Sequence, residues 1–294
     1  MKVQYYFSRL FNIFREGIKY TRNASFPVAH YYSPIVGIDE YRKAKTAGLQ
    51  KDELSDVDFK TNEQLELLTS FNSFQSEMPS WDGNDGNRYK LRNDWYPETD
   101  GIVLYSVLRK FNPKRVIEVG SGFSSACMLD VNDHFCDGKM QFTFIEPNPE
   151  RLNDLLKSND KSLAKIIVKN VQTVDLEQFK SLEANDMLLI DSSHITKTGS
   201  DVNFLIFQVF PVLKPGVIIH IHDIFDGFEY PEKWIISGRS WNESYILRAF
   251  LQNNSAYEML FFSDYLQQHH KEAFVSNIDP KRYLNGSSIY LRKR

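Results

Sequence analysis

Short apolar runs rich in β-branched and aromatic residues recur through the chain after about residue 115, and helical patterns separate them. Runs of this length, bounded by turn residues, are typical of strands buried on both faces of a parallel sheet. The runs are 116–119, 142–145, 166–168, 187–190, 217–221, 257–262 and 288–292. Because strands and helices alternate, the pattern predicts an α/β protein with a doubly wound, mainly parallel, seven-stranded sheet and right-handed crossovers.

The part of the chain before the first run has a different pattern. Residues 61–74 and 98–111 each show apolar positions at helical spacing, and residues 1–22 predict a basic amphipathic helix. Such a helix usually buries its apolar stripe against protein, and a membrane surface is the second alternative. The sequence therefore predicts a mostly helical N-terminal extension over residues 1–95 and a main domain over residues 96–294.

A glycine turn follows the first predicted strand. Gly120 and Gly122 come directly after it, and a helical pattern begins near Ser124. Glycines allow a tight turn and let a ligand approach the backbone, while the start of the helix offers free N–H groups. The second strand ends on Glu146, the position at which nucleotide-binding sheets hold ribose hydroxyls. This strand–turn–helix unit predicts a site for a nucleoside.

Glu118-Val-Gly120-Ser-Gly122, with Glu146 closing the next strand, resembles the first two motifs of the class I S-adenosylmethionine (SAM) dependent methyltransferases. Ser124 stands where the dinucleotide fingerprint has its third glycine, which favours SAM, a ligand without phosphate, over NAD. The resemblance implies the Rossmann-like methyltransferase fold, an antiparallel last strand, and SAM as the cofactor. It also implies cofactor contacts from Glu118, Gly120, Gly122, Ser124, Glu146 and Asp191.

Polar residues also follow the fourth and fifth predicted strands. Asp191 and His194 follow the fourth, and His222 and Asp223 follow the fifth. In an open α/β sheet, ligands bind beyond the carboxyl ends of the strands, so these residues are expected beside the cofactor. His194 and His222 are candidate general bases because histidine titrates near neutral pH, and Asp191 is the third candidate catalytic residue. Asp191, His222 and Asp223 are candidate ligands of Mg²⁺ or another divalent ion.

The spacing of these polar residues is similar to that of the cation-dependent O-methyltransferases, including their sugar and macrolide methyltransferase-like members. In that family an aspartate ends the fourth strand, a basic group follows three positions later, and a pair of metal ligands ends the fifth. Here either His222 replaces one carboxylate or Ile224 replaces the amide, depending on the register, and both depart from the all-oxygen site that Mg²⁺ prefers. Two alternatives stay open: Asp191 and Asp223 bind a cation, or they cap helices or bind the amine of the cofactor.

Two aromatic segments flank the expected site. The resemblance implies that Trp95 and Tyr96 fold over the methionine end of the cofactor, and packing in the core is the alternative. Residues 225–241 directly follow the fifth strand and combine aromatic with charged side chains, so they are a candidate lid or acceptor-binding segment. A surface excursion that packs its own aromatic residues is the alternative.

Charge and cysteine content limit the classes of partner and compartment. The formal net charge is −3 and no basic stripe runs along the sequence, so nucleic acid is not expected as a partner. The two cysteines form no disulfide framework, and no apolar run approaches the roughly 18 residues needed to cross a bilayer. These features predict a cytoplasmic protein.

We therefore expect a SAM-dependent methyltransferase that methylates a hydroxyl of a sugar, a glycan or a small natural product. The sequence leaves two alternatives. One is another enzyme on the same fold, such as a hydroxylase-like activity, because a fold does not determine a function. The other is a non-catalytic SAM-binding module docked to a partner or a membrane through residues 1–22. The sequence does not decide between a monomer and a homo-oligomer.

Overall fold

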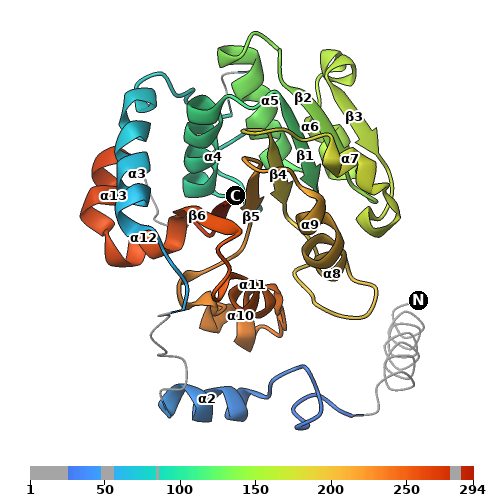
Figure 1. Ribbon diagram of the computed structural model, residues 1–294, viewed down its shortest axis with the longest axis vertical. Helices are drawn as coiled ribbons and strands as arrows, with labels where there is room; N and C mark the ends of the chain where they lie inside the picture. The colour runs from blue at the N-terminus through green and yellow to red at the C-terminus, as the bar shows by residue number, and fades with distance from the viewer. Residues whose placement is uncertain (1–25, 48–55, 84–85, 279–285) are drawn as a thin grey trace, which may run out of the picture. The chain divides into compact units, whose positions relative to one another are not determined.

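The computed structural model describes residues 26–47, 56–83, 86–278 and 286–294. The chain divides into two compact units (Figure 1). The larger unit comprises Glu53–Tyr230 and Trp241–Arg294, and the smaller unit comprises Met1–Asp52 and Pro231–Ser240. The predicted amphipathic helix at residues 1–22 lies outside the described residues.

A seven-stranded sheet forms the centre of the larger unit, in the order β3-β2-β1-β4-β5-β7-β6. The strands are β1 (Arg115–Val119), β2 (Gln141–Ile145), β3 (Ala164–Ile167), β4 (Met187–Ile190), β5 (Ile218–Ile221), β6 (Tyr257–Phe262) and β7 (Ile289–Lys293). The first five strands are parallel, and β7 runs antiparallel to both β5 and β6. The predicted fold class and the antiparallel last strand are therefore confirmed. Strand order reverses between β1 and β4, and this switch point is where open α/β sheets bind ligands.

Helices cover both faces of the sheet. Those of the larger unit are α3 (Thr61–Gln75), α4 (Glu98–Phe111), α5 (Phe123–Phe135), α6 (Glu150–Leu155), α7 (Leu176–Lys180), α8 (Asp201–Phe204), α9 (Phe210–Val212), α11 (Glu243–Leu251), α12 (Ser263–His269) and α13 (Lys271–Asn277). Short 3₁₀ segments occupy Ser158–Ser162, Val171–Thr173 and Asp226–Phe228, and the π-helical segment Leu205–Val209 joins α8 to α9. The sequence pattern did not predict α12 and α13, which bury few apolar side chains; α13 packs beside α3 (Figure 1).

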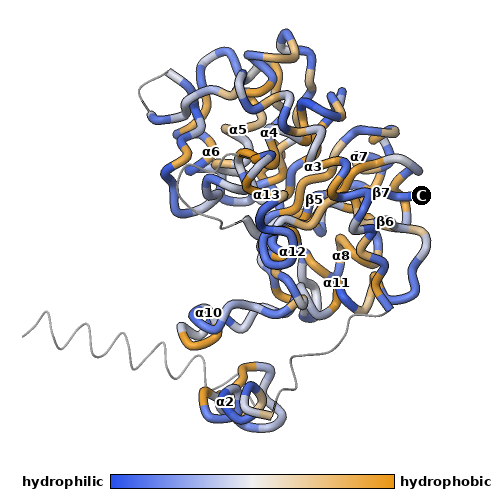
Figure 2. Tube along the Cα trace, turned by 90° about the vertical axis from the view of Figure 1, so that its left-hand side faces the viewer, coloured by the Kyte–Doolittle hydropathy of each residue, from blue (hydrophilic) through white to orange (hydrophobic). Residues whose placement is uncertain are grey.

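Alternating strand residues supply two separate hydrophobic cores. In β4, Met187 and Leu189 belong to the core shared with α4 and α5, whereas Leu188 and Ile190 belong to the core on the opposite face. Figure 2 shows that hydrophobic segments gather in the sheet. Burial on both faces explains why these strands read as continuous apolar runs, and it leaves the strand ends as the places for polar chemistry.

The larger unit begins at Glu53, so the predicted boundary after residue 95 falls inside it. The physical reason is shared burial: Phe71 of α3 and Trp81 pack in the same core as α4. Arg88, which is 5% exposed, fastens this region to the rest of the unit. Its guanidinium donates to Asp130 of α5 at 2.9 Å and to Asp160 at 2.8 Å. The segment that leads to the cofactor side of the sheet is therefore anchored by buried charges.

The smaller unit contains α2 (Ile38–Thr46) and α10 (Glu232–Ile236) among its described residues. Lys45 of α2 forms an ion pair with Glu232 of α10. The candidate lid at residues 225–241 is thus divided between the two units, and its role as a lid stays a prediction.

Candidate functional site

A cavity of about 330 Å³ opens at the carboxyl ends of β1, β2, β4 and β5. Its walls come from the glycine turn, from the ends of these strands and from two tryptophans. The lining residues are Trp95, Tyr96, Gly120, Ser121, Gly122, Phe123, Ser124, Glu146, Arg151, Asp191, Ser192, Ser193, His194, Asp223 and Trp241. Most of the predicted site residues therefore meet in one cavity, with Glu118 and His222 outside its lining.

Gly120 makes the close approach between the glycine turn and β4. Its φ is +79°, in the left-handed region that favours glycine, and a Cβ there would lie 1.8 Å from the backbone oxygen of Asp191. A side chain at residue 120 would therefore push the turn away from the end of β4. The glycine is needed to keep these two walls of the cavity together.

Glu118 supports the turn from behind and is not among the residues that line the cavity, so its contact with the cofactor stays a prediction. Its side chain is fully buried, and the hydroxyls of Ser124 and Ser125 donate to its two oxygens. Burial raises the pKa of Glu118 to about 8 against the opposing effect of these hydrogen bonds. Ser124 lines the cavity, but its hydroxyl is directed to Glu118.

Glu146 faces the cavity from the end of β2. One carboxylate oxygen accepts from the backbone N–H of Ser121 at 3.0 Å, and the other accepts from that of Asn148 at 2.8 Å. Each oxygen keeps further lone pairs, so the carboxylate is held in place and can still accept hydrogen bonds from a ligand. This geometry fits the predicted contact with ribose hydroxyls.

Trp95 and Tyr96 take different positions. Trp95 is 57% exposed at the cavity, and the guanidinium carbon of Arg151 lies 3.6 Å from the centre of its ring. Tyr96 is buried, with its ring centre 4.8 Å from that of His222. Both residues line the cavity, Trp95 as an exposed ring and Tyr96 as a buried ring beside His222, and their place over the methionine end of the cofactor stays a prediction.

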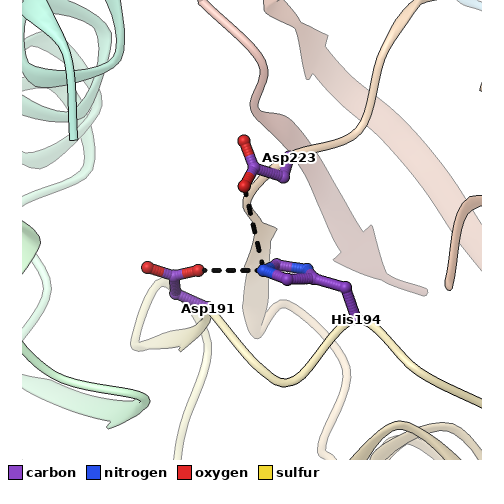
Figure 3. A group of neighbouring side chains, drawn as sticks. All are labelled: Asp191, His194 and Asp223. Atoms are coloured by element: carbon purple, nitrogen blue, oxygen red, sulfur yellow. Dashed lines mark ion pairs between the residues drawn. The ribbon is translucent and has the colours of Figure 1, made fainter. Parts of the chain in front are cut away.

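His194 lies between two aspartates. Its Nε2 is 3.3 Å from Oδ1 of Asp191 and 3.8 Å from Oδ2 of Asp223, and Figure 3 shows both contacts ending on the same ring nitrogen. Its Nδ1 lies 2.9 Å from a carboxylate oxygen of Glu243, the first residue of α11. The backbone of His194 (φ +58°) and that of Asp223 (φ +59°) are left-handed, a strained conformation that is concentrated at functional sites.

His222 approaches the same aspartates from the buried side. Its Nδ1 is 3.6 Å from Oδ1 of Asp191 and 3.7 Å from Oδ1 of Asp223, and this nitrogen makes no hydrogen bond. Its Nε2 lies 3.3 Å from Oδ2 of Asp100, a fully buried carboxylate at the start of α4. Each histidine thus has one nitrogen backed by a carboxylate and the other directed at the aspartates.

The carboxylates hold both histidines in the protonated form when no cation is bound. Burial alone would lower the pKa of His194, but the carboxylates of Asp191 and Glu243 outweigh it and raise that pKa to about 10. The pKa of His222 is also raised well above its ordinary value, since Asp223, Asp100 and Asp191 outweigh its burial. A protonated imidazole cannot accept a proton, so these carboxylates disfavour the role of general base for both rings in the metal-free state.

Asp191, His194 and Asp223 can also hold a metal ion. One ligand atom from each of the three lies within 4.8 Å of the others. His222 adds a nitrogen without a hydrogen-bond partner on the far side of the same carboxylates. The donors present therefore fit a divalent ion, and a mixed set of imidazole and carboxylate suits Mn²⁺, Fe²⁺ or Zn²⁺ better than Mg²⁺. His194 was predicted as a base and not as a ligand.

Trp241, the last residue of the predicted lid or acceptor-binding segment, lines the cavity, and its ring centre is 4.2 Å from that of His194. Three residues at the site were not predicted from the sequence: Asp100, Arg151 and Glu243. These residues come from segments far apart in the chain, and no motif connects them. Asp100 and Glu243 could be recognised in the sequence only as acidic residues near the starts of α4 and α11. Acidic residues are common there because they stabilise the positive end of the helix dipole.

Residues 117–224 match the family described as a methyltransferase domain. An uncharacterized protein of Archaeoglobus fulgidus is 32% identical over 169 residues, which cover 54% of this chain and 75% of that protein. No helix among the described residues is long and apolar enough to span a membrane.

Solved structures of methyltransferases are similar at lower identity. The methyltransferase PaMTH1 of Podospora anserina, solved with bound S-adenosylhomocysteine (SAH), has 13% identity, a TM-score of 0.45, and coverage of 88% of this chain and 98% of its own. The O-methyltransferase TomG of Streptomyces achromogenes, solved with SAM, has 15% identity, a TM-score of 0.38, and coverage of 66% and 81%. Likenesses at this level are not evidence of a shared acceptor.

Proposed function

Since this chain belongs to the class I SAM-dependent methyltransferases, we propose that it methylates a hydroxyl group of a sugar, a glycan or a small natural product. The observation that carries the choice of a hydroxyl is the cluster of Asp191, His194, His222 and Asp223 beside the cofactor cavity. A hydroxyl is a poor nucleophile until a base or a metal ion removes its proton. This cluster supplies the groups for either route.

The cofactor cavity fits SAM through residues of this chain. Gly120 brings the turn against the end of β4, Glu146 offers a fixed acceptor for the ribose hydroxyls, and Trp95 lines the cavity. Glu118 holds the turn in shape through Ser124. Bound SAM supplies an electrophilic methyl group. The protein's task is then to align the acceptor oxygen, exclude water and receive the hydroxyl proton.

Replacing Glu146 with alanine is expected to weaken binding of SAH by about 1–3 kcal/mol, because two ribose hydroxyls lose a charged acceptor. Titration calorimetry measures the change. Glu150→Ala is the matched control, since Glu150 is exposed, lies close in the chain and does not line the cavity. Equal affinity of the Glu146→Ala variant and the wild type would show that Glu146 does not hold the ribose.

Charge balance favours the metal route at this cluster. Two imidazoles face Asp191 and Asp223, and Glu243 and Asp100 stand behind them, so four carboxylates surround two rings. This arrangement requires positive charge, which two ring protons or one divalent cation can supply. A cation at Asp191, His194 and Asp223 would displace the proton from His194 and lower the pKa of an acceptor hydroxyl bound to it.

Metal affinity is therefore expected to rise with pH. In the metal-free protein the pKa of His194 is raised from 6.5 to about 10, and binding a cation must release that proton. Between about pH 6.5 and pH 8.5, each proton that Mn²⁺ displaces should raise its affinity up to about tenfold for every pH unit. Calorimetry in buffers of different ionisation enthalpy counts the protons. Binding that releases none would exclude His194 as a ligand.

The raised pKa of His194 also makes the stability of the metal-free protein depend on pH. A raised pKa of His194 stabilises the folded metal-free protein fully below pH 6.5, and this contribution is lost as pH rises toward about 10.

Profiling with SAM labelled in its methyl group tests the proposal as a whole. Purified protein is incubated with metabolite and glycan fractions, and labelled products are identified by mass spectrometry. The expected product carries the label as an O-methyl ether that resists mild base. A labelled amine or thiol product would contradict the proposed acceptor. Tight SAH binding without any labelled product would favour a non-catalytic module.

A further inference from the structure

We propose that Glu243 is a positioning residue, which fixes the His194 imidazole so that Nε2 alone faces Asp191 and Asp223 at the cavity. This inference rests on the proposed function of that cavity. Glu243 is 3% exposed and lies 49 residues after His194 in the chain. It belongs to α11, whereas His194 belongs to the loop after β4. The contact is therefore made by the tertiary fold.

Hydrogen bonds other than the one to the imidazole fix the carboxylate of Glu243 in place. Ser192 donates its hydroxyl toward both oxygens of Glu243, at 3.2 and 3.3 Å, and accepts from the backbone N–H of His194 at 3.2 Å. The backbone N–H groups of Asn242 and Glu243 in turn donate to the carbonyl of His194, at 3.0 and 3.2 Å. The start of α11 and the loop after β4 are thus joined on both sides of the ring.

The chemistry of this contact determines which ring nitrogen is free. A carboxylate only accepts hydrogen bonds, so Nδ1 of His194 must carry a proton toward Glu243 at 2.9 Å. Nε2 is then the ring atom that can donate to Asp191, accept a proton or bind a cation. Trp241 packs against the ring face with its centre 4.2 Å away, which restricts rotation of the imidazole. Carboxylates in this position orient histidines that act as metal ligands or bases.

His222 shows the same arrangement from the other side of the aspartates. Asp100 lies 3.3 Å from its Nε2, which leaves Nδ1 to face Asp191 and Asp223. Asp100 also accepts from the backbone of Ser287 and the hydroxyl of Ser288, so its replacement would disturb the start of β7 as well. Glu243 is therefore the partner that can be tested with less structural damage.

The test measures Mn²⁺ binding by electron paramagnetic resonance and, in metal-free protein labelled with ¹⁵N-histidine, the Nδ1–H resonance of His194. In Glu243→Gln, affinity for Mn²⁺ is expected to fall about 10–100-fold, the typical loss when the partner of a liganding histidine is removed. The strongly deshielded Nδ1–H resonance should disappear. Glu243→Asp, which keeps the charge, should recover part of the affinity.

Glu258→Gln is the matched control, because it makes the same substitution away from the site. Glu258 accepts from Nε of Arg294 at 3.0 Å, and neither residue lines the cavity, so both signals of the site should stay unchanged. If Glu243→Gln does not fold, Ser192→Ala removes the hydroxyl that holds the carboxylate and should weaken Mn²⁺ binding in the same direction. A folded Glu243→Gln protein with an unchanged Nδ1–H resonance would overturn the proposal. Failure of the wild type to bind Mn²⁺ would overturn the metal route, and the resonance would still decide the role of Glu243.

Discussion

Glutamine in place of His194 is expected to lower kcat by about 10²–10⁴-fold, the usual cost of losing a group that receives the acceptor proton or holds the cation that acidifies it. SAH affinity should change little, because the proposed cofactor contacts are those of the glycine turn and Glu146. His222→Gln should cost less, because His222 is buried behind the aspartates and does not line the cavity. Turnover is measured with labelled SAM and the acceptor found by profiling.

Chelation separates the two routes by which His194 could act. If a cation is required, protein treated with EDTA should lose turnover and regain it with Mn²⁺, and the His194→Gln variant should regain little. If His194 acts as a base without metal, EDTA should have no effect. His269→Gln serves as the control, because His269 is an exposed histidine with a similar carboxylate partner, Asp226. Full turnover of the His194→Gln variant would place the reacting groups elsewhere.

The sheet, and the meeting of the glycine turn and Glu146 in one cavity, were predictable because each depends on short-range sequence patterns. Strands buried on both faces read as apolar runs, and the glycines after β1 mark the one turn that must pass close to β4. The place of Glu146 in the cavity was predictable because this residue directly follows β2. The hydrogen bonds of Glu118 to the serines of its own turn were not predictable, because a carboxylate at the end of a strand gives the same sequence pattern whether it faces a ligand or its own turn.

The catalytic side was less predictable because its properties depend on long-range contacts. The sequence gives two histidines near neutral pKa, whereas the fold surrounds them with four carboxylates and raises both pKa values. Glu243 and Asp100 supply half of those charges from α11 and α4, and no spacing rule connects them to His194 or His222. These carboxylates favour the protonated form of each ring in the metal-free protein, and this supports the metal route over a free base.

Arg88→Met is expected to lower the free energy of unfolding by about 3–5 kcal/mol, the typical cost of removing one partner from a buried charge pair. The side chain of Arg88 is 2% exposed, and it neutralises Asp130 and Asp160, whose side chains are 0% and 1% exposed. Methionine keeps much of the volume, so the loss should come from the two uncompensated carboxylates. Urea unfolding of purified protein measures the change.

The Arg88→Met substitution should also weaken binding at the cofactor site, whereas a defect confined to the surroundings of Arg88 would leave that binding unchanged. Its backbone and side chain tie the segment before Trp95 to α5, since the N–H of Arg88 and the indole N–H of Trp81 both donate to Asp130 at 3.0 and 3.1 Å. A loosened segment should weaken SAH binding in the folded variant, because Trp95 lines the cavity. Lys139→Met removes an exposed ion pair with Asp137 and should change neither property. Normal stability of Arg88→Met would mean that the three neighbouring aspartates, including Asp133, relax without cost when their cation is removed.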